Sequence, residues 1–268
     1  MQHPRAESRQ NLSQGEIVSS SAALLARLRA SSPRVHCVTN AVAQNFTANA
    51  LLAFGAVPSM TLSGEEIGAF VQRSDALLIN LGTFDRERRE ATAIAIDTAF
   101  RHNLPWVLDP VFIDRAPQRA AYARDLMCLN PKAVRLNAAE FGALAEREPN
   151  PASVAAYARE RKVVVGLSGA TDLIADGERS VSISNGHPLM AKVTAMGCAA
   201  SALVAACLAV EPDALKATAA AFLMVGVAGE MAAVHSQGPG TFAAQILDAL
   251  YDLDEAALAG HAKIEISK

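Results

Sequence analysis

Short apolar segments recur between helical patterns in this chain, and they constrain its fold more than any other feature. Residues 76–81 (ALLINL) and 106–108 (WVL) are almost continuously apolar, and residues 162–167 contain the run VVV. Such segments are typical of strands that are buried on both faces of a sheet. Because helical patterns alternate with them in the first half, the sequence predicts an α/β fold with a mainly parallel central sheet and helices on both faces.

The other predicted elements follow from the same patterns. Gly55 is expected to end a helix over residues 45–54, and Thr83 to cap a helix over residues 85–102. Further helices are expected at residues 20–29, 67–71 and 138–145 and from Gly197 onward. Further strands are expected at residues 35–38, 57–60, 134–136 and 264–266, with a hairpin formed by residues 171–175 and 180–184.

The length predicts a single domain with a substantial core, since the chain has 268 residues. Residues 1–16 are polar and are expected to form a flexible arm ahead of a domain at residues 17–268. The most apolar stretch is residues 214–234. Lys216 and Glu230 interrupt it and small residues dilute it, so a buried helix is favoured over a membrane span.

Charge and cysteine usage narrow the classes of function. The formal net charge of -3 indicates no basic face, so neither nucleic acid nor a membrane is an expected partner. The four cysteines contain no CxxC pair, and their spacing fits neither a zinc site nor a disulfide framework. Reduced thiols and a cytoplasmic location are therefore expected.

Polar residues follow several of the predicted strands. Ligands of parallel α/β sheets bind beyond the carboxyl ends of the strands, so these positions are the first candidates for a site. They are Thr39-Asn40, Gly82-Thr83, Asp109-Pro110, residues 137–140 and Ser168-Gly169.

The start of the helix near Gly197 is a further candidate. Residues 191–202 read AKVTAMGCAASA, a short turn that leads into a helix of small residues. The free N–H groups and the positive dipole end of such a helix suit a phosphate, and the same dipole predicts a lowered pKa for the Cys198 thiol. From these residues alone, an ordinary helix start with a buried cysteine is the favoured interpretation.

Longer motifs follow one another across residues 35 to 255: VHCVTNAVAQNFTANALLAFGAVPSM, INLGTFD, WVLDPV, LNAAE, LSGATDLIADG, NGHPLMAKVTAMGC and GPGTF. In these motifs and their order the chain resembles the hydroxyethylthiazole kinases, which belong to the ribokinase-like superfamily. The resemblance implies a ribokinase-like fold, ATP with Mg²⁺ as cofactors, and a cytoplasmic homotrimer with substrate pockets between subunits. The implied reaction is phosphorylation of the hydroxyethyl group of 4-methyl-5-(2-hydroxyethyl)thiazole in thiamine salvage.

The resemblance also implies roles for single residues. Cys198 matches the family's active-site cysteine and would accept the alcohol proton, while the turn at Gly197 would stabilise the transferred phosphoryl group. Glu140 matches the Asn-x-x-Glu motif that holds magnesium through water, and Asp109 is assigned to the same ion. From the residues alone, Glu140 is equally a helix-surface carboxylate and Asp109 a turn residue or helix cap.

Two residues are assigned to the nucleotide on the same basis. Arg119 lies at the spacing of a family arginine that contacts ATP phosphate, and Ser168 stands where the family has a Thr or Ser that touches the nucleotide. A solvated loop arginine and a plain strand-end turn are the open alternatives.

The chain departs from the family pattern near the expected ligands. Gln44 replaces a methionine of the substrate helix, Ala195-Met196 replaces Gly-Thr before Gly197, and residues 112–116 (FIDRA) replace a loop rich in Gly and Ala. Gln44 and Ala195 are expected to line the substrate pocket. Because these positions differ, a kinase of another heterocyclic alcohol and a ligand-binding relative with low turnover stay open as alternatives. A cysteine hydrolase using Cys198 and His235 lacks an orienting partner.

Overall fold

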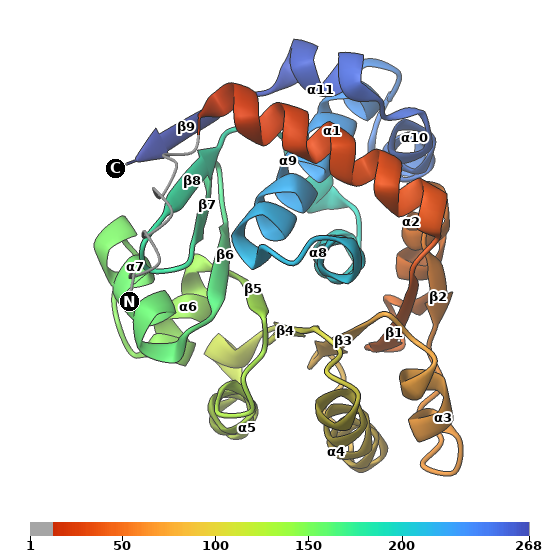
Figure 1. The fold of residues 1–268 in the computed structure, drawn as a ribbon, viewed down its shortest axis with the longest axis vertical. Coiled ribbons are helices and arrows are strands. Elements are labelled where there is room, and N and C mark those ends of the chain that lie inside the picture. Colours follow the sequence, from red (N-terminus) through yellow and green to blue (C-terminus); the bar gives the residue numbers. More distant parts are fainter. Residues whose placement is uncertain (1–12, 268) are drawn as a thin grey trace, which may run out of the picture.

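One sheet of nine strands runs through the part of the chain that the computed structural model describes, residues 13–267 (Figure 1). The strands are β1 (Arg34–Val38), β2 (Val57–Ser59), β3 (Ala76–Asn80), β4 (Trp106–Asp109), β5 (Ala133–Asn137), β6 (Val164–Ser168), β7 (Asp172–Ala175), β8 (Ser180–Ile183) and β9 (Ile264–Ser267). Their order across the sheet is β2-β1-β3-β4-β5-β6-β7-β8-β9.

The pairing within the sheet is parallel from β2 to β6 and antiparallel from β6 to β9. Strands β3 and β4 are buried along their whole length, as their apolar sequences predict. The mainly parallel sheet and the hairpin, formed by β7 and β8, are confirmed. Because the parallel strands share one direction, their carboxyl ends lie along one edge, where a site is expected.

Six helices cover one face of the sheet in the described chain (Figure 1): α1 (Gln14–Ser31), α2 (Gln44–Phe54), α8 (Met196–Val210), α9 (Ala214–Val234), α10 (Pro239–Asp252) and α11 (Glu255–His261). Their buried side chains form one core with those of the sheet, including Leu28, Phe54, Leu203 and Phe242. A short 3₁₀ helix at Pro188–Lys192 leads toward α8.

Five helices cover the other face: α3 (Ile67–Gln72), α4 (Arg86–Arg101), α5 (Pro117–Met127), α6 (Ala138–Ala145) and α7 (Pro151–Arg161). A second core lies beneath them, in which Phe141 and Tyr157 meet edge to face with ring centroids 5.7 Å apart. Helices on both faces are thus confirmed. Sequence patterns did not indicate α5 or α7, although proline at the first position of each is a recognised start signal.

The first helix begins earlier than expected. Ser13 caps α1 with a reciprocal box: its hydroxyl accepts from the Glu16 N–H at 3.2 Å, and its own N–H donates to Glu16 Oε2 at 2.6 Å. Residues 13–16, which were expected to belong to a flexible arm, therefore form the start of α1. The rest of the expected arm, residues 1–12, lies outside the described residues.

The cap of α4 was predicted at the wrong residue. Asp85, and not Thr83, occupies the cap position, where its Oδ1 accepts from the Arg88 N–H at 2.8 Å. A carboxylate at this place also interacts with the positive end of the helix dipole. Gly55 does end α2 as predicted, in the left-handed conformation with φ 102°.

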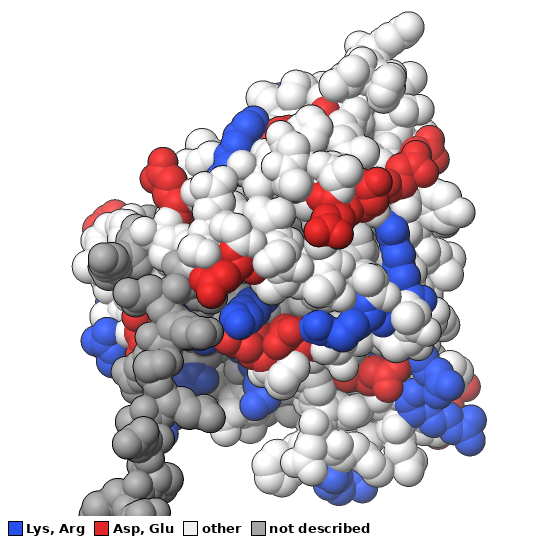
Figure 2. Space-filling model, turned by 45° about the horizontal axis from the view of Figure 1, so that its top comes forward, with Lys and Arg blue, Asp and Glu red and all other residues white. Residues whose placement is uncertain are grey.

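Helix α9 has the length and composition of a membrane-spanning segment, but it lies inside the fold. Most of its apolar residues are buried, and it packs against α1, α8 and α10 as well as strands β6 to β8. The interpretation as a buried helix is therefore confirmed. On the face shown in Figure 2, basic and acidic side chains lie interspersed and do not form a large area of one sign.

Candidate active site

Polar side chains from separate elements meet at the carboxyl edge of the sheet. Asn40 follows β1, Asn80 ends β3 and Asp109 ends β4, while Cys198 lies in the first turn of α8. Asn80 Nδ2 donates to Asp109 Oδ2 at 2.7 Å. Asn40 Nδ2 donates to Asn80 Oδ1 at 3.0 Å and to Cys198 Sγ at 3.3 Å. The parallel register places Asn80, which sequence analysis did not name, beside Asp109, and the hydrogen bond from Asn40 connects these strand ends to the cysteine.

The Cys198 thiol does not have the lowered pKa that its place at a helix start predicts. Burial, and then the charge of Asp109, raise the pKa of Cys198 to about 11, while the side-chain amides of Asn80 and Asn40 oppose this rise. The prediction is wrong because burial and a neighbouring carboxylate destabilise the thiolate by more free energy than the helix dipole contributes to stabilising it. Cys198 is therefore mainly a neutral thiol near neutral pH.

Asp109 is one of the few buried carboxylates in the described chain, with 2% of its surface exposed. Burial raises its pKa to about 6. The charge of Arg135 opposes this rise, whereas the charge of Glu140 adds to it. Its burial excludes the alternative of a solvated turn residue.

Glu140 joins the start of α6 to the loop after β4. Its Oε2 accepts from the Asn137 N–H at 2.9 Å, completing a capping box, and its Oε1 accepts from the Phe112 N–H at 2.8 Å. The alternative of a surface carboxylate is wrong, because Glu140 is only 5% exposed. The loop that it holds places Phe112 in the left-handed conformation, with φ 57°.

The carboxylates can accommodate a hard cation, although they do not enclose one. Among residues 13–267, no three or more His, Cys, Asp or Glu side chains are grouped so that they could hold a metal ion by themselves. Glu140 is close enough to Asp109 for its charge to raise the pKa of Asp109. Oxygen ligands of this kind suit Mg²⁺, which usually keeps several waters and shares phosphate oxygens.

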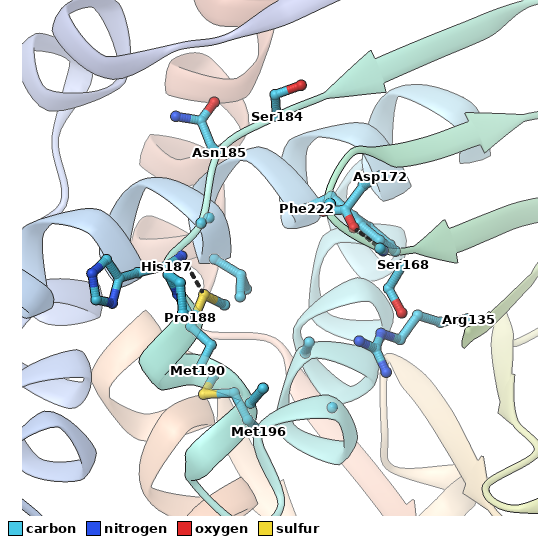
Figure 3. A pocket seen from close by; sticks show the side chains of 18 of the residues that line it. Arg135, Ser168, Asp172, Ser184, Asn185, His187, Pro188, Met190, Met196 and Phe222 are labelled. Carbon is cyan, nitrogen blue, oxygen red and sulfur yellow. Dashed lines mark hydrogen bonds between the residues drawn. The ribbon is translucent and has the colours of Figure 1, made fainter. Parts of the chain in front are cut away.

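A cavity of about 590 Å³ opens beside the start of α8. Figure 3 shows Arg135, Ser168, Asp172 and Phe222 on one side of it and His187, Pro188 and Met190 on the other. Gly197 and Met196 form its boundary with α8. Sequence analysis assigned Ser168 and Gly197 to a phosphate site, and the structure brings both to this cavity.

Arg135 is the functional candidate that sequence analysis missed. Its guanidinium points into the same part of the cavity as Ser168 (Figure 3), and among residues 13–267 its Nε is buried with no hydrogen-bond partner, as is that of Arg119. A Cβ atom at Gly197 would lie 2.7 Å from Arg135 Nη1, so glycine allows the close approach. An arginine within the otherwise apolar strand β5 was the signal that could have identified it.

Arg119 does not line this cavity. Its Nη1 donates to the Val111 carbonyl at 2.8 Å, and its guanidinium lies over the Phe84 ring, 5.9 Å from the centroid. Desolvation lowers its pKa, although an arginine stays charged. The structure therefore holds Arg119 against the loop after β4 and does not bring it together with Ser168.

Gln44 and Ala195 belong to two elements that pack together, and Ala195 directly precedes the helix that carries the cysteine. Gln44 is the first residue of α2, half-buried, and α2 packs against α8. Ala195 precedes α8 in the left-handed conformation, with φ 71° and ψ 0°. That conformation favours glycine, so the alanine carries a local strain on the order of 1 kcal/mol. Neither residue lines the cavity beside Arg135.

The aromatic side of the cavity rests directly on the sheet. A Cβ atom at Gly166 in β6 would lie 2.7 Å from Phe222 Cε2. Gly166 is also the register partner of Arg135 in β5. The sheet therefore presents an arginine and a glycine side by side, and the glycine leaves room for the Phe222 ring.

Comparison with known proteins gives one family along most of the chain. The model of the Hydroxyethylthiazole kinase family matches residues 25–256. A protein of Agrobacterium fabrum (strain C58 / ATCC 33970) named "Probable hydroxyethylthiazole kinase" is 44% identical over 244 residues, which cover 91% of this chain and 94% of the relative.

Solved structures agree with this assignment. The structure of a hydroxyethylthiazole kinase protein from Pyrococcus horikoshii OT3 has a TM-score of 0.90 and 34% identity, and it covers 93% of this chain and 100% of that chain. A ribokinase-like superfamily protein from Enterococcus faecalis V583 has a TM-score of 0.64 at 13% identity, covering 94% and 100% of the two chains, and shows the fold alone. The fold is thus ribokinase-like, and the chain belongs to the hydroxyethylthiazole kinase family.

Proposed function

We propose that this chain transfers the γ-phosphoryl group of ATP to the hydroxyl of 4-methyl-5-(2-hydroxyethyl)thiazole, a step of thiamine salvage. The observation that carries the proposal is the start of α8, where the cavity with Arg135 meets the cluster of Asp109 and Cys198. One side offers a cation and free N–H groups that suit phosphate, and the other offers polar groups for a hydroxyl. The family is named for this alcohol.

The cavity is the place for the nucleotide. The apolar side chains that line it, Phe222 and Met190 among them, suit a base, and the guanidinium of Arg135 suits a phosphate. The Ser168 hydroxyl donates to the Leu136 carbonyl at 3.2 Å and keeps its acceptor lone pairs. We therefore assign the phosphate contact to Arg135. The resemblance assigns this contact to Arg119 instead, and measuring ATP affinity in variants of both arginines decides between them.

Magnesium fits between the nucleotide and the two carboxylates. Asp109 and Glu140 would hold it, largely through water, because backbone N–H groups already occupy lone pairs on both Glu140 oxygens. When bound, the ion neutralises charge on the transferred phosphoryl group. The mutual repulsion of the two carboxylates supports this assignment, since a cation would relieve it.

The acceptor alcohol would lie against Cys198, Ala195 and Gln44. Cys198 is the proposed proton acceptor, and its raised pKa leaves thiolate as a minor species at neutral pH. Phosphoryl transfer through a loose transition state depends mainly on positioning and electrostatic stabilisation, so a strong base is not required. The role of Cys198 is therefore to orient the hydroxyl as well as to take its proton.

An ATP-consumption screen over small heterocyclic alcohols, with magnesium present, tests the proposal. Turnover is expected to be highest with the thiazole alcohol. For the variant Cys198→Ala in this assay, Cys128→Ala is the matched control, because Cys128 is exposed at the end of α5 and its thiol bonds to the nearby Arg124 carbonyl. If another alcohol, such as a hydroxymethylpyrimidine, is turned over best, the second candidate function holds. If no alcohol is turned over, the chain is a ligand-binding relative.

The second candidate, a kinase of a different heterocyclic alcohol, has one observation in its favour. Gln44 and Ala195 both depart from the family pattern, and they stand on elements that pack together beside Cys198. A glutamine brings donors and an acceptor where a methionine would bring none of comparable strength.

A cytoplasmic homotrimer is proposed as the working state. Apolar side chains are exposed around the edge strand β2, including Val57 on the strand itself, Leu52 on α2 and Phe70 on α3. A second copy that covers this edge would bury them and would also protect the unpaired strand. Sedimentation equilibrium of the full chain tests the proposal, and a monomer at micromolar concentration would contradict it.

A further inference from the structure

The two asparagines beside Cys198 have fixed hydrogen-bonding directions. Asn40 Oδ1 accepts from the Ala43 N–H at 3.0 Å, and Asn80 Oδ1 accepts from the Gly82 N–H at 3.0 Å. A backbone N–H can only donate, so each amide must turn its oxygen toward that group and its NH₂ away from it. The backbone thus sets the direction of both amides.

The donors of these amides form a chain that ends at the sulfur. The NH₂ of Asn80 donates to the Asp109 carboxylate, and the NH₂ of Asn40 donates to both Asn80 Oδ1 and Cys198 Sγ. The Cys198 sulfur is therefore an acceptor in this arrangement, and its own hydrogen is left to point elsewhere. Asn40 and Asn80 are only 8% and 2% exposed, which leaves little room for water to replace either amide.

Packing keeps the Asn40 amide in place. A Cβ atom at Gly82 would lie 2.6 Å from Asn40 Nδ2, so the amide is packed against the backbone of this glycine. The same backbone supplies the N–H that orients Asn80. One short segment after β3 thus fixes both the place of Asn40 and the direction of its neighbour.

We propose that Asn40 is a positioning residue, whose amide N–H holds the Cys198 sulfur as an acceptor while the Ala43 N–H and Asn80 Oδ1 fix the direction of that amide. A donated hydrogen bond also favours the thiolate, which opposes the effects of burial and of Asp109 on the cysteine. The inference rests on the proposed function for the use that the alcohol makes of Cys198, but the hydrogen bond can be tested without turnover.

Alkylation of Cys198 by iodoacetamide in Asn40→Ser tests the hydrogen bond. A serine hydroxyl can still accept from the Ala43 N–H, but it is too short to reach the sulfur. The rate is measured at fixed pH by mass spectrometry, with the exposed Cys128 of the same sample as the internal reference. The Cys198 rate is expected to fall roughly tenfold, because a lost hydrogen bond lowers the thiolate fraction.

A merely structural role for Asn40 gives the opposite result. The smaller serine opens the site, so an unchanged or faster reaction of Cys198 would overturn the proposal. Asn49→Ser is the matched control, since Asn49 is exposed on α2 and bonds only to Asn45. If Asn40→Ser does not fold, Asn40→Asp keeps the shape and the oxygen toward Ala43 but removes the donor, and slower alkylation is again expected.

A kinetic cycle extends the test to function. Asn40→Ser is expected to lower kcat with little change in the KM for ATP, and to cause no further loss in a Cys198→Ala background. Additive losses would overturn the proposal, because residues that act through one another do not add. If the parent turns over no alcohol, the proposed function fails, and the alkylation rates still decide the role of Asn40.

Discussion

Replacing Arg135 by alanine should weaken ATP binding, and it should do so more strongly than replacing Arg119. The Arg135 guanidinium lies beside Gly197 at the start of α8, and its Nε is buried without a partner. A charge-assisted hydrogen bond contributes about 1.5–3 kcal/mol. Since each 1.4 kcal/mol is about a factor of ten, the Kd for ATP should rise roughly 10- to 150-fold.

Calorimetric titration with ATP and magnesium measures this change, and Arg119→Ala is the matched control. Arg119 is also half-buried and its Nε likewise has no partner, but its Nη1 bonds to the Val111 carbonyl, it packs on Phe84 and it does not line the cavity, so its loss should change the Kd little. Arg135→Lys, which keeps the charge and loses the planar fork, should give an intermediate Kd. If Arg119→Ala weakens binding and Arg135→Ala does not, the assignment from the resemblance holds and the reasoning from the cavity is refuted.

The remaining predictions concern turnover, specificity and stability. Cys198→Ala should lower kcat by roughly 10²–10⁴ with ATP binding nearly intact, and Cys198→Asp should retain activity. Steady-state kinetics measure both variants. An alanine variant as fast as the parent would show that Cys198 is not the proton acceptor. Gln44→Met should move preference toward the thiazole alcohol, and an identical ranking of the alcohol panel would show that Gln44 does not set specificity. Ala195→Gly should raise the free energy of unfolding by roughly 0.5–1 kcal/mol, since it relieves the left-handed alanine at φ 71°, and an unchanged urea midpoint would contradict the strain. Burial raises the pKa of Asp172 to about 6 from its ordinary 3.8, so the folded chain binds the carboxyl proton more tightly than the unfolded chain does. The free energy of unfolding should therefore fall as the pH rises between these two values, and Asp172→Asn should flatten that part of its pH profile. An unaltered slope in the variant would show that Asp172 does not titrate there.

Much of the fold was predictable because it depends on local patterns. Buried parallel strands such as β3 and β4 require continuous apolar residues, and these are visible in the sequence. Helices α5 and α7 were missed because their alanines and arginines give only a weak apolar stripe, so tertiary packing and the starting proline define them. The cap of α4 was misplaced by two residues, since a threonine and an aspartate both satisfy the local rule.

The site was predictable in its parts but not in its electrostatics. Strand ends and a helix start indicated Asp109 and Cys198, because topology alone brings such positions to one edge. The raised pKa of Cys198 was not predictable, because it depends on burial and on the distance to a carboxylate that lies far away in sequence. Arg135 was missed for a related reason: a charged residue inside a strand has meaning only once the cavity beside it is known.

The contact between Gly166 and Phe222 helps to set the depth of this cavity. The ring of Phe222 lies on bare sheet backbone, and one added methyl group at Gly166 would overlap it. The ring would then have to shift, and the shape of the cavity would change with it, because Phe222 lines the cavity. A residue that does not line the cavity thus sets how much space is left there for the proposed nucleotide base. Affinity can therefore drift during evolution, or be tuned by design, through a position inside the sheet while every contacting group stays the same.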